Sequence, residues 1–287
     1  MATLRAIRKR IKSAKNIQQI TKAMKMVAAA KLRKAQERIL MARTYANKIR
    51  EVIFELIIGI EENSYPLLIE NADVKKEAVL LITSDKGLCG SFNSNLIKET
   101  MLKMKENNDI NFIFVGKKGM DYFKRFNFNK EIELFKYNDK KIDWYDVEEI
   151  GNLLINNYLK KNYRKVHLIY SEFQTSLQQK VKKEILLPVK FEPQLLENKI
   201  EKRDFLYEPD EKTVLNALLE RYIKNNIFRA ILESQAAEHG VRMVSMEMAT
   251  NNAGDMIKSL TLLANKTRQA SITKEISEIV GGAEAVK

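Results

Sequence analysis

The feature that most constrains the fold is a long stretch without helix breakers at the start of the chain. Residues 1–58 contain neither glycine nor proline, the two residues that most often end a helix. Apolar or small residues recur there in steps of three and four, as along the seam of two supercoiled helices. A helix of about 55 residues would be roughly 80 Å long, at about 1.5 Å per residue. The predicted seam is Leu4, Ile7, Ile11, Ala14, Ile17, Ile20, Met24, Ala28, Leu32, Ala35, Ile39, Ala42, Ala46, Ile49, Ile53, Leu56 and Ile60.

The other end of the chain has the same character. Residues 210–280 contain no proline and only two glycines, and Asp210 is placed to cap the start of a helix. A helix cannot bury a single apolar stripe alone, so we predict that the two terminal helices pair, in antiparallel orientation. Uneven steps between Ala14 and Leu32 predict a local disturbance of the supercoil. The second seam is predicted at Met246, Ala249, Ala253, Met256, Leu260, Leu263, Thr267 and Ala270.

The middle of the chain alternates between strand and helix patterns, which predicts an α/β domain with a partly parallel sheet. Apolar runs predict strands at 78–83, 111–116, 131–136, 165–173 and 181–189. Helices are predicted at 93–106, 117–126 and 143–161, and an extended polar connector at 191–210.

The predicted fold is therefore a mixture of α+β and α/β architecture. A long antiparallel two-helix coiled coil is formed by the N- and C-terminal helices, and a Rossmann-like α/β domain is inserted between them. We predict an N-terminal coiled-coil helix at 1–60, an α/β foot domain at 75–205, and a C-terminal helix at 210–285 that pairs with the first.

The positive charge of the chain is concentrated in the first helix. Residues 1–50 hold fifteen lysines and arginines and one acidic residue, Glu37, whereas the chain as a whole carries +13. Such a segment suits nucleic acid, an anionic membrane surface, an acidic protein partner, or simply the solvated exterior of a coiled coil. Residues 1–44 lack aromatic side chains, which disfavours stacking on single strands, and the charges surround a narrow seam that leaves no broad apolar face. An acidic protein partner is slightly favoured.

No catalytic, cofactor-binding or metal-binding motif is found in the sequence. The loop ITSDKGLCGSFN (82–93) joins a predicted strand to a predicted helix, but it lacks the glycine spacing and the lysine of a phosphate-binding loop. We interpret Gly87 and Gly90 as turn residues; a nucleotide-binding enzyme that uses residues 84–92 stays the opposing hypothesis. His167 is expected to pack within a strand, and Cys89, the only cysteine, excludes an intramolecular disulfide. No signal peptide and no membrane-spanning apolar run are expected.

Three stretches resemble the gamma subunit of bacterial F-type ATP synthases: 15–36 (KNIQQITKAMKMVAAAKLRKAQ), 82–93, and 241–286, which begins VRMVSMEMATNNAGD. The resemblance implies a non-catalytic rotor shaft that couples proton flow through the membrane sector to ATP synthesis, reversibly. It implies as partners the alpha and beta subunits, the epsilon subunit and the c-ring, with no nucleic acid and no direct membrane insertion. It also implies a peripheral location on the cytoplasmic face of the bacterial inner membrane. A basic coiled-coil protein that binds nucleic acid is the alternative.

The resemblance also implies which residues contact partners. Lys22, Met24 and Lys25 would face an acidic loop of the beta subunit, and Arg268 and Gln269 would hydrogen-bond beta-subunit loops. Each residue has a plainer interpretation as well, because Met24 would pack in the seam and Glu275 would be solvated. The full set is Lys22, Met24, Lys25, Arg242, Arg268, Gln269, Thr273 and Glu275.

Overall fold

The computed structural model describes residues 3–57, 65–106, 109–126, 132–135, 143–175, 178–190 and 207–284. The chain divides into two compact units. The terminal unit consists of Met1–Ala29 and Arg242–Lys287, and the central unit of Ala30–Val241. Two long helices, α1 (Leu4–Ile57) and α5 (Glu211–Glu284), contribute to both units. Within the described residues, no helix combines the length and the apolar character needed to cross a membrane.

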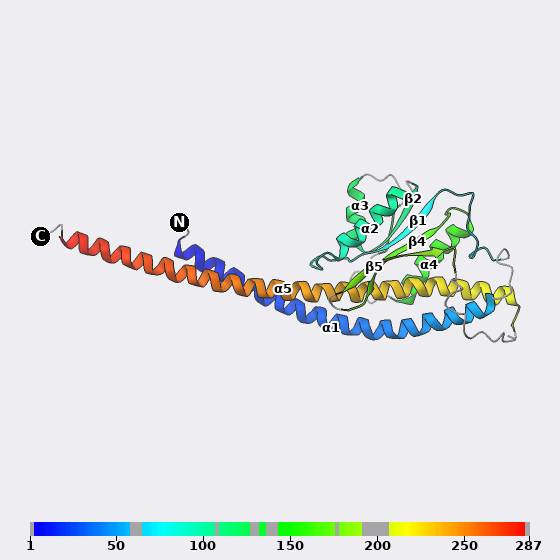
Figure 1. Cartoon of the computed structure of the whole chain (residues 1–287), viewed down its shortest axis with the longest axis horizontal. Coiled ribbons are helices and arrows are strands. Elements are labelled where there is room, and N and C mark those ends of the chain that lie inside the picture. Colours follow the sequence, from blue (N-terminus) through cyan, green and yellow to red (C-terminus); the bar gives the residue numbers. More distant parts are fainter. Residues whose placement is uncertain are drawn as a thin grey trace. The chain divides into compact units, whose positions relative to one another are not determined.

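The core of the central unit is a five-stranded sheet in the order β3-β2-β1-β4-β5 (Figure 1). The first four strands run parallel, and β5 is antiparallel to β4. Every residue of β1 and β2 is buried, which explains why these strands read as continuous apolar runs. All five strand predictions are confirmed within a few residues. The strands are β1 (Glu77–Ile82), β2 (Ile110–Val115), β3 (Ile132–Phe135), β4 (Val166–Phe173) and β5 (Gln179–Leu187).

Helices cover both faces of this sheet (Figure 1). On one face, Val79 and Leu81 pack with α2 (Phe92–Glu106) and α3 (Lys117–Phe123), which is followed by a 3-10 turn, η2 (Lys124–Phe126). On the other face, Leu80 and Ile82 pack with α4 (Trp144–Leu159) and α5. The three helix predictions are confirmed. The predicted connector at 191–210 lies largely outside the described residues.

In the central unit, α5 packs against both the sheet and α1. Its start is capped as predicted, since the Thr213 N–H donates to Asp210 Oδ1 at 2.9 Å. Arg43 of α1 pairs with Glu233 of α5, and α1 residues further along belong to the same core as the start of α5, so the two helices run antiparallel. The shared core includes Ile49, Ile53 and Leu56 from α1 and Leu215, Leu219, Ile223, Ile227, Ala230 and Ile231 from α5.

In the terminal unit, the predicted seam of α1 is wrong at two positions. Ile17 and Ile20 are 52% and 60% exposed, whereas Gln18 is half-buried and Thr21 is buried. The apolar stretch from Ala28 onward buries residues in regular steps of three and four, and the same phase continued backward places Gln18 and Thr21 in the seam. The predicted disturbance rested on Ile17 and Ile20, and the burial pattern has no break there.

The predicted seam of α5 is also only partly correct. Met246 and Ala253 are buried, but Met256 is 56% exposed and Leu263 is 47% exposed. Ala270 is exposed too. The half-buried or buried positions that alternate in steps of four and three are Met246, Thr250, Ala253, Ile257, Leu260, Ala264 and Thr267. The prediction took the steps of three and four in the wrong order, so it named Met256 and Leu263 where Ile257 and Ala264 lie in the seam.

Candidate partner-binding site

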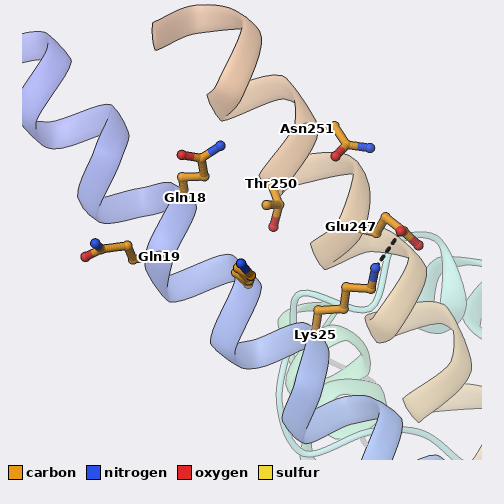
Figure 2. A pocket seen from close by; sticks show the side chains of 7 residues that line it. Gln18, Gln19, Lys25, Glu247, Thr250 and Asn251 are labelled. Atoms are coloured by element: carbon orange, nitrogen blue, oxygen red, sulfur yellow. Dashed lines mark hydrogen bonds and ion pairs between the residues drawn. The ribbon is translucent and has the colours of Figure 1, made fainter.

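Two of the predicted contact residues lie beside a polar layer between α1 and α5 in the terminal unit (Figure 2). Lys25 Nζ forms an ion pair with Glu247 Oε1 at 2.5 Å, and both side chains are partly exposed. Lys22 is exposed, and Met24 is half-buried. Lys25 therefore joins the two helices while its side chain remains accessible to a partner.

The same polar layer forms a cleft of about 370 Å³. The Thr21 and Thr250 hydroxyls lie 2.8 Å apart at its edge. All seven lining residues are polar or charged, and they come from both helices of the terminal unit. The cleft is lined by Gln18, Gln19, Lys22, Lys25, Glu247, Thr250 and Asn251.

The second group of predicted residues lies in the last part of α5. Every residue from Arg268 to Gly282 is exposed. The Thr273 hydroxyl donates to the Gln269 backbone carbonyl at 3.0 Å, and the Gln269 residue is exposed. Glu275 accepts a hydrogen bond from Ser271 at 3.3 Å.

The structure does not bring the two groups together. Thr250, which faces Thr21, and Arg268 are eighteen residues apart on α5, or about 27 Å along the helix axis. Arg242 lies on α5 before both groups and is half-buried. The candidate residues thus form separate patches along the terminal unit.

The glycine loop is a structural turn held by its own side chains. Asn93 accepts from the Ser84 N–H at 3.1 Å and donates to the Ser84 hydroxyl at 2.8 Å. The Asn93 amide also lies 3.3 Å from the sulfur of Cys89, which is buried. Leu88 has a φ of 62° and Gly90 a φ of 52°, so the chain reverses through two left-handed residues. These contacts support the turn interpretation of the loop.

A buried charged cluster lies under α2 in the central unit. Glu77 Oε2 is 3.1 Å from Lys103 Nζ and 3.0 Å from His167 Nε2. Burial lowers the pKa of His167, and the nearby Lys103 lowers it further. Burial alone would raise the pKa of Glu77, but the hydrogen bond from Lys103 and the charges of both neighbours lower it. His167 is buried within β4, which confirms that it packs in a strand.

Sequence reasoning missed the partners of these residues. Glu247 pairs with Lys25 although 222 positions separate them, and Glu233 pairs with Arg43 across 190 positions. The two pairings follow from the antiparallel register of α1 and α5. The sequence predicts the antiparallel pairing of the two helices but not the register that brings these residues together.

Taken together, the fold and the site define a class of protein. Two long antiparallel helices enclose an α/β domain in the sequence, and the exposed candidate residues follow the helices. The class is a helix-pair protein with an α/β domain inserted between the two helices.

A family model described as ATP synthase matches residues 3–286. The chain is 44% identical over 288 residues to the ATP synthase gamma chain of Pelotomaculum thermopropionicum, and 41% identical over 296 residues to that of Bdellovibrio bacteriovorus. In both comparisons the whole of each chain is covered. The chain belongs to the ATP synthase gamma-chain family and is a non-catalytic subunit.

Solved structures agree with this assignment. The chain is similar to one in the central stalk/c-ring structure of Tetrahymena thermophila mitochondrial ATP synthase, with a TM-score of 0.61 and 27% identity. That match covers 80% of this chain and 99% of the other. A chain of the Euglena gracilis mitochondrial ATP synthase has the same fold, with a TM-score of 0.69 and 22% identity over 99% of this chain and 94% of that one. The hypothesis of a nucleic-acid-binding protein has no support among these relatives.

Proposed function

We propose that this chain is the central rotor subunit of a bacterial F-type ATP synthase, coupling proton flow through the membrane sector to ATP synthesis. The observation that carries the proposal is the full-length relationship to ATP synthase gamma chains. The exposed end of α5 supports it, because a single helix with exposed Ile272, Ile276 and Ile279 needs a surrounding partner to cover it.

The proposal assigns a mechanical part to each region. Residues 1–60 and 210–285 form an antiparallel coiled coil that turns inside a ring of alpha and beta subunits. Residues 75–205 form the Rossmann-like foot, which binds the epsilon subunit and rests on the c-ring. Each orientation of the shaft favours a different state of each beta subunit, and this bias is reciprocal, so ATP hydrolysis reverses the rotation.

The candidate residues are the contacts through which the bias acts. Lys22, Met24 and Lys25 face an acidic beta-subunit loop, and the basic first helix complements that charge. Arg268 and Gln269 hydrogen-bond beta-subunit loops. Arg242, Thr273 and Glu275 extend the same contact surface along α5.

The proposed location follows from these partners. The chain is peripheral on the cytoplasmic face of the inner membrane, is held there by the complex, and binds no nucleic acid. Binding to DNA that falls steeply with added salt would contradict this part of the proposal.

Reconstitution tests the function directly. The full chain is mixed with alpha and beta subunits, and the mass of the product is measured by light scattering after size-exclusion chromatography. We expect a complex that contains this chain and recruits epsilon. A chain that stays monomeric beside an assembled alpha/beta ring would overturn the proposal.

Replacing Gln269 by leucine tests the contact surface. We expect Gln269→Leu to lower ATP turnover of the assembled complex by roughly two- to tenfold, which corresponds to the loss of one hydrogen bond of ~0.5–1.5 kcal/mol. Because Gln269 is exposed, the urea midpoint of the isolated chain should not change. Gln178→Leu removes an exposed glutamine of the central unit and is the matched control. Equal turnover for the two variants would argue against a specific contact at Gln269.

A further inference from the structure

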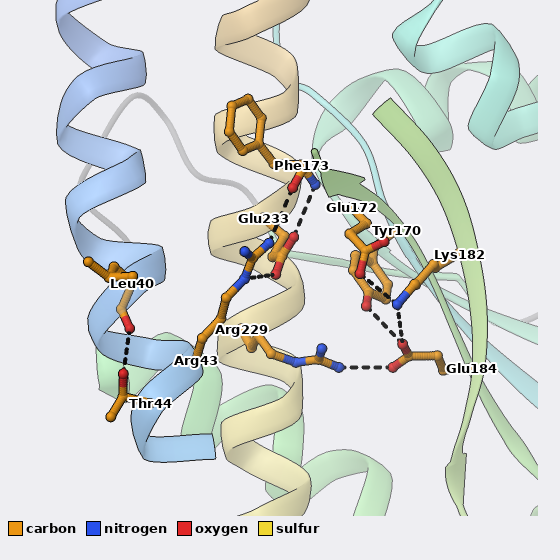
Figure 3. Close-up of polar contacts among 10 residues, drawn as sticks. All are labelled: Leu40, Arg43, Thr44, Tyr170, Glu172, Phe173, Lys182, Glu184, Arg229 and Glu233. Atoms are coloured by element: carbon orange, nitrogen blue, oxygen red, sulfur yellow. Dashed lines mark hydrogen bonds and ion pairs between the residues drawn. The ribbon is translucent and has the colours of Figure 1, made fainter. Parts of the chain in front are cut away.

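One carboxylate of the central unit joins three elements at a single point (Figure 3). Glu233 lies on α5, and its side chain is only 1% exposed. Its Oε1 accepts a hydrogen bond from Arg43 Nε of α1 at 2.9 Å, and its Oε2 accepts from the backbone N–H of Phe173, the last residue of β4, at 3.0 Å. Arg43 Nη2 then donates to the Phe173 carbonyl at 3.2 Å, which closes the cycle. We call Arg43, Glu233 and the Phe173 backbone the three-way joint.

The end of β4 needs these contacts because it extends beyond the last residue that pairs with β1. The register of β1 with β4 ends at Ile169, whereas β4 continues to Phe173. The Ser171 N–H donates to Ser234 Oγ at 3.0 Å, and the Phe173 N–H donates to Glu233. Side chains of α5 thus supply acceptors to β4 beyond its pairing with β1, which avoids the cost of buried, unsatisfied N–H groups.

A second contact, one turn away on α5, links α5 to the sheet without involving α1. Arg229 Nη2 donates to Glu184 Oε2 of β5 at 3.0 Å, and the Tyr170 hydroxyl donates to the other oxygen of Glu184 at 2.9 Å. Arg229 and Glu233 are four residues apart and therefore face the same side of the helix. The Glu184 contact links α5 to β4 and β5, whereas the three-way joint also includes α1.

Directional bonds at this point do what apolar packing cannot. Hydrophobic contact between α1, α5 and the sheet is strong but non-directional, so it opposes sliding and twisting only weakly. Hydrogen bonds between ionised groups are short and oriented, and they are stronger where water is excluded. The hydrogen bond to Glu233 also raises the pKa of Arg43, so this arginine stays charged.

We propose that Arg43 and Glu233 are positioning residues that fix both long helices to the sheet of the central unit, so that torque passes between the α/β domain and both helices without slip. This inference rests on the proposed rotor function and extends it. Neither residue touches substrate; both act by keeping three elements in register.

The test uses the assembled complex in inverted membrane vesicles, where ATP hydrolysis and ATP-driven ion uptake are measured together. We expect Glu233→Gln and Arg43→Lys to lower the ions taken up per ATP hydrolysed while hydrolysis itself continues. Glutamine keeps an acceptor but loses the charge, and lysine keeps the charge but cannot reproduce the fork that reaches both Glu233 and Phe173. Arg43→Lys should therefore retain more coupling than Arg43→Met.

The matched control is Thr44→Ala, next to Arg43 on α1. Among the described residues, the Thr44 hydroxyl bonds to the Leu40 carbonyl of its own helix alone, at 3.0 Å, so its loss should leave the ratio unchanged (Figure 3). Only variants with the complex content and thermal midpoint of wild type are compared for ions taken up per ATP hydrolysed. A merely structural role would change complex content and thermal midpoint but not this ratio. If Glu233→Gln does not assemble, the partly exposed Arg43 and its lysine variant decide the question.

The outcomes separate the two proposals. Wild-type coupling in both Glu233→Gln and Arg43→Lys, at normal complex content, would overturn the three-way joint as a coupling element and leave the rotor function intact. A wild-type chain that neither assembles nor supports ATP-driven uptake would overturn the rotor function itself.

Discussion

The two halves of the helix pair are built from different chemistry. In the central unit, α1 buries alternating alanine and large aliphatic residues, among them Ile39, Ala42 and Ile53. In the terminal unit, the equivalent positions include Gln18, Thr21 and Lys25, and α5 facing them offers Glu247 and Thr250. The central half is mainly apolar apart from the Arg43–Glu233 pair. The terminal half alternates buried apolar residues such as Ile7 and Ala14 with a polar layer around Thr21, Lys25 and Glu247.

This difference separates two requirements. Apolar burial fixes the fold, because each buried aliphatic side chain adds to the free energy of unfolding. Polar seam residues contribute little net stability but favour one register between two helices. We therefore expect the central unit to supply most of the free energy of unfolding. We expect the terminal unit to contribute less stability but to hold its two helices in one register.

Truncating one isoleucine in each half should give the largest difference in the free energy of unfolding between the two halves. Ile53 is fully buried in the core of the central unit, and Ile53→Ala should lower the free energy of unfolding by about 2–5 kcal/mol. Ile17 is 52% exposed, so Ile17→Ala should stay within about 0.5 kcal/mol of wild type. Urea unfolding of the full-length chain measures both. Equal losses would mean that Ile17 lies in the seam after all.

The same contrast explains what the sequence could predict. Strands β1 and β2 are buried on both faces, so their apolar runs stood out, and breaker-free ends were enough to predict α1 and α5. Two seam positions of α1 in the terminal unit were missed because Gln18 and Thr21 look like surface residues, while Ile17 looks like core. Their placement depends on the phase set by residues farther along α1.

The candidate site divides in a similar way. Arg268 and Gln269 could be named only through a resemblance, since nothing in their local pattern distinguishes them from other exposed residues. The partners of Arg43 and Lys25 could not be named at all. Each lies about 200 positions away, and its identity depends on the antiparallel register of two helices.

Acid should weaken the central unit specifically, with an effect smaller than that of Ile53→Ala. Both histidines of the chain lie in this unit. Burial lowers the pKa of His167 below its ordinary value of 6.5, with Lys103 and Lys183 lowering it and Glu77 opposing them. The unfolded chain therefore binds a proton more readily, and stability is lost as the pH falls below 6.5 and through the lowered pKa. The pKa of Glu77 is also lowered, so its contribution is lost only below 4.5.

A variant isolates this effect. His167→Asn cannot titrate, so its urea midpoint should change less than that of wild type between about pH 7.5 and about pH 5.5. Parallel curves for the two proteins would show that another group controls the response to acid.

The smallest expected effect has the opposite sign and lies in the terminal unit. Gly254 is in the middle of α5, and a Cβ added there would meet only the Gln18 side-chain nitrogen, at 3.0 Å. That atom is the end of a flexible side chain, so Gly254→Ala should raise the free energy of unfolding of this unit by up to about 1 kcal/mol through helix propensity. Hydrogen exchange of the flanking amides measures it locally.

The double variant Gln18→Ala, Gly254→Ala tests whether the side chain stands in the way. If the gain from Gly254→Ala is larger when Gln18 is already truncated, then Gln18 occupies the seam and yields at some cost. If the two changes are additive, Gln18 points away from α5, and the polar half of the helix pair is less ordered at this layer than the apolar half. The central unit offers the opposite case, because a Cβ at Gly116 would lie 2.1 Å from the Thr83 carbonyl oxygen, which cannot move aside. Gly254 in the polar half of the helix pair is thus replaceable, whereas Gly116 in the α/β domain is fixed by its backbone neighbour.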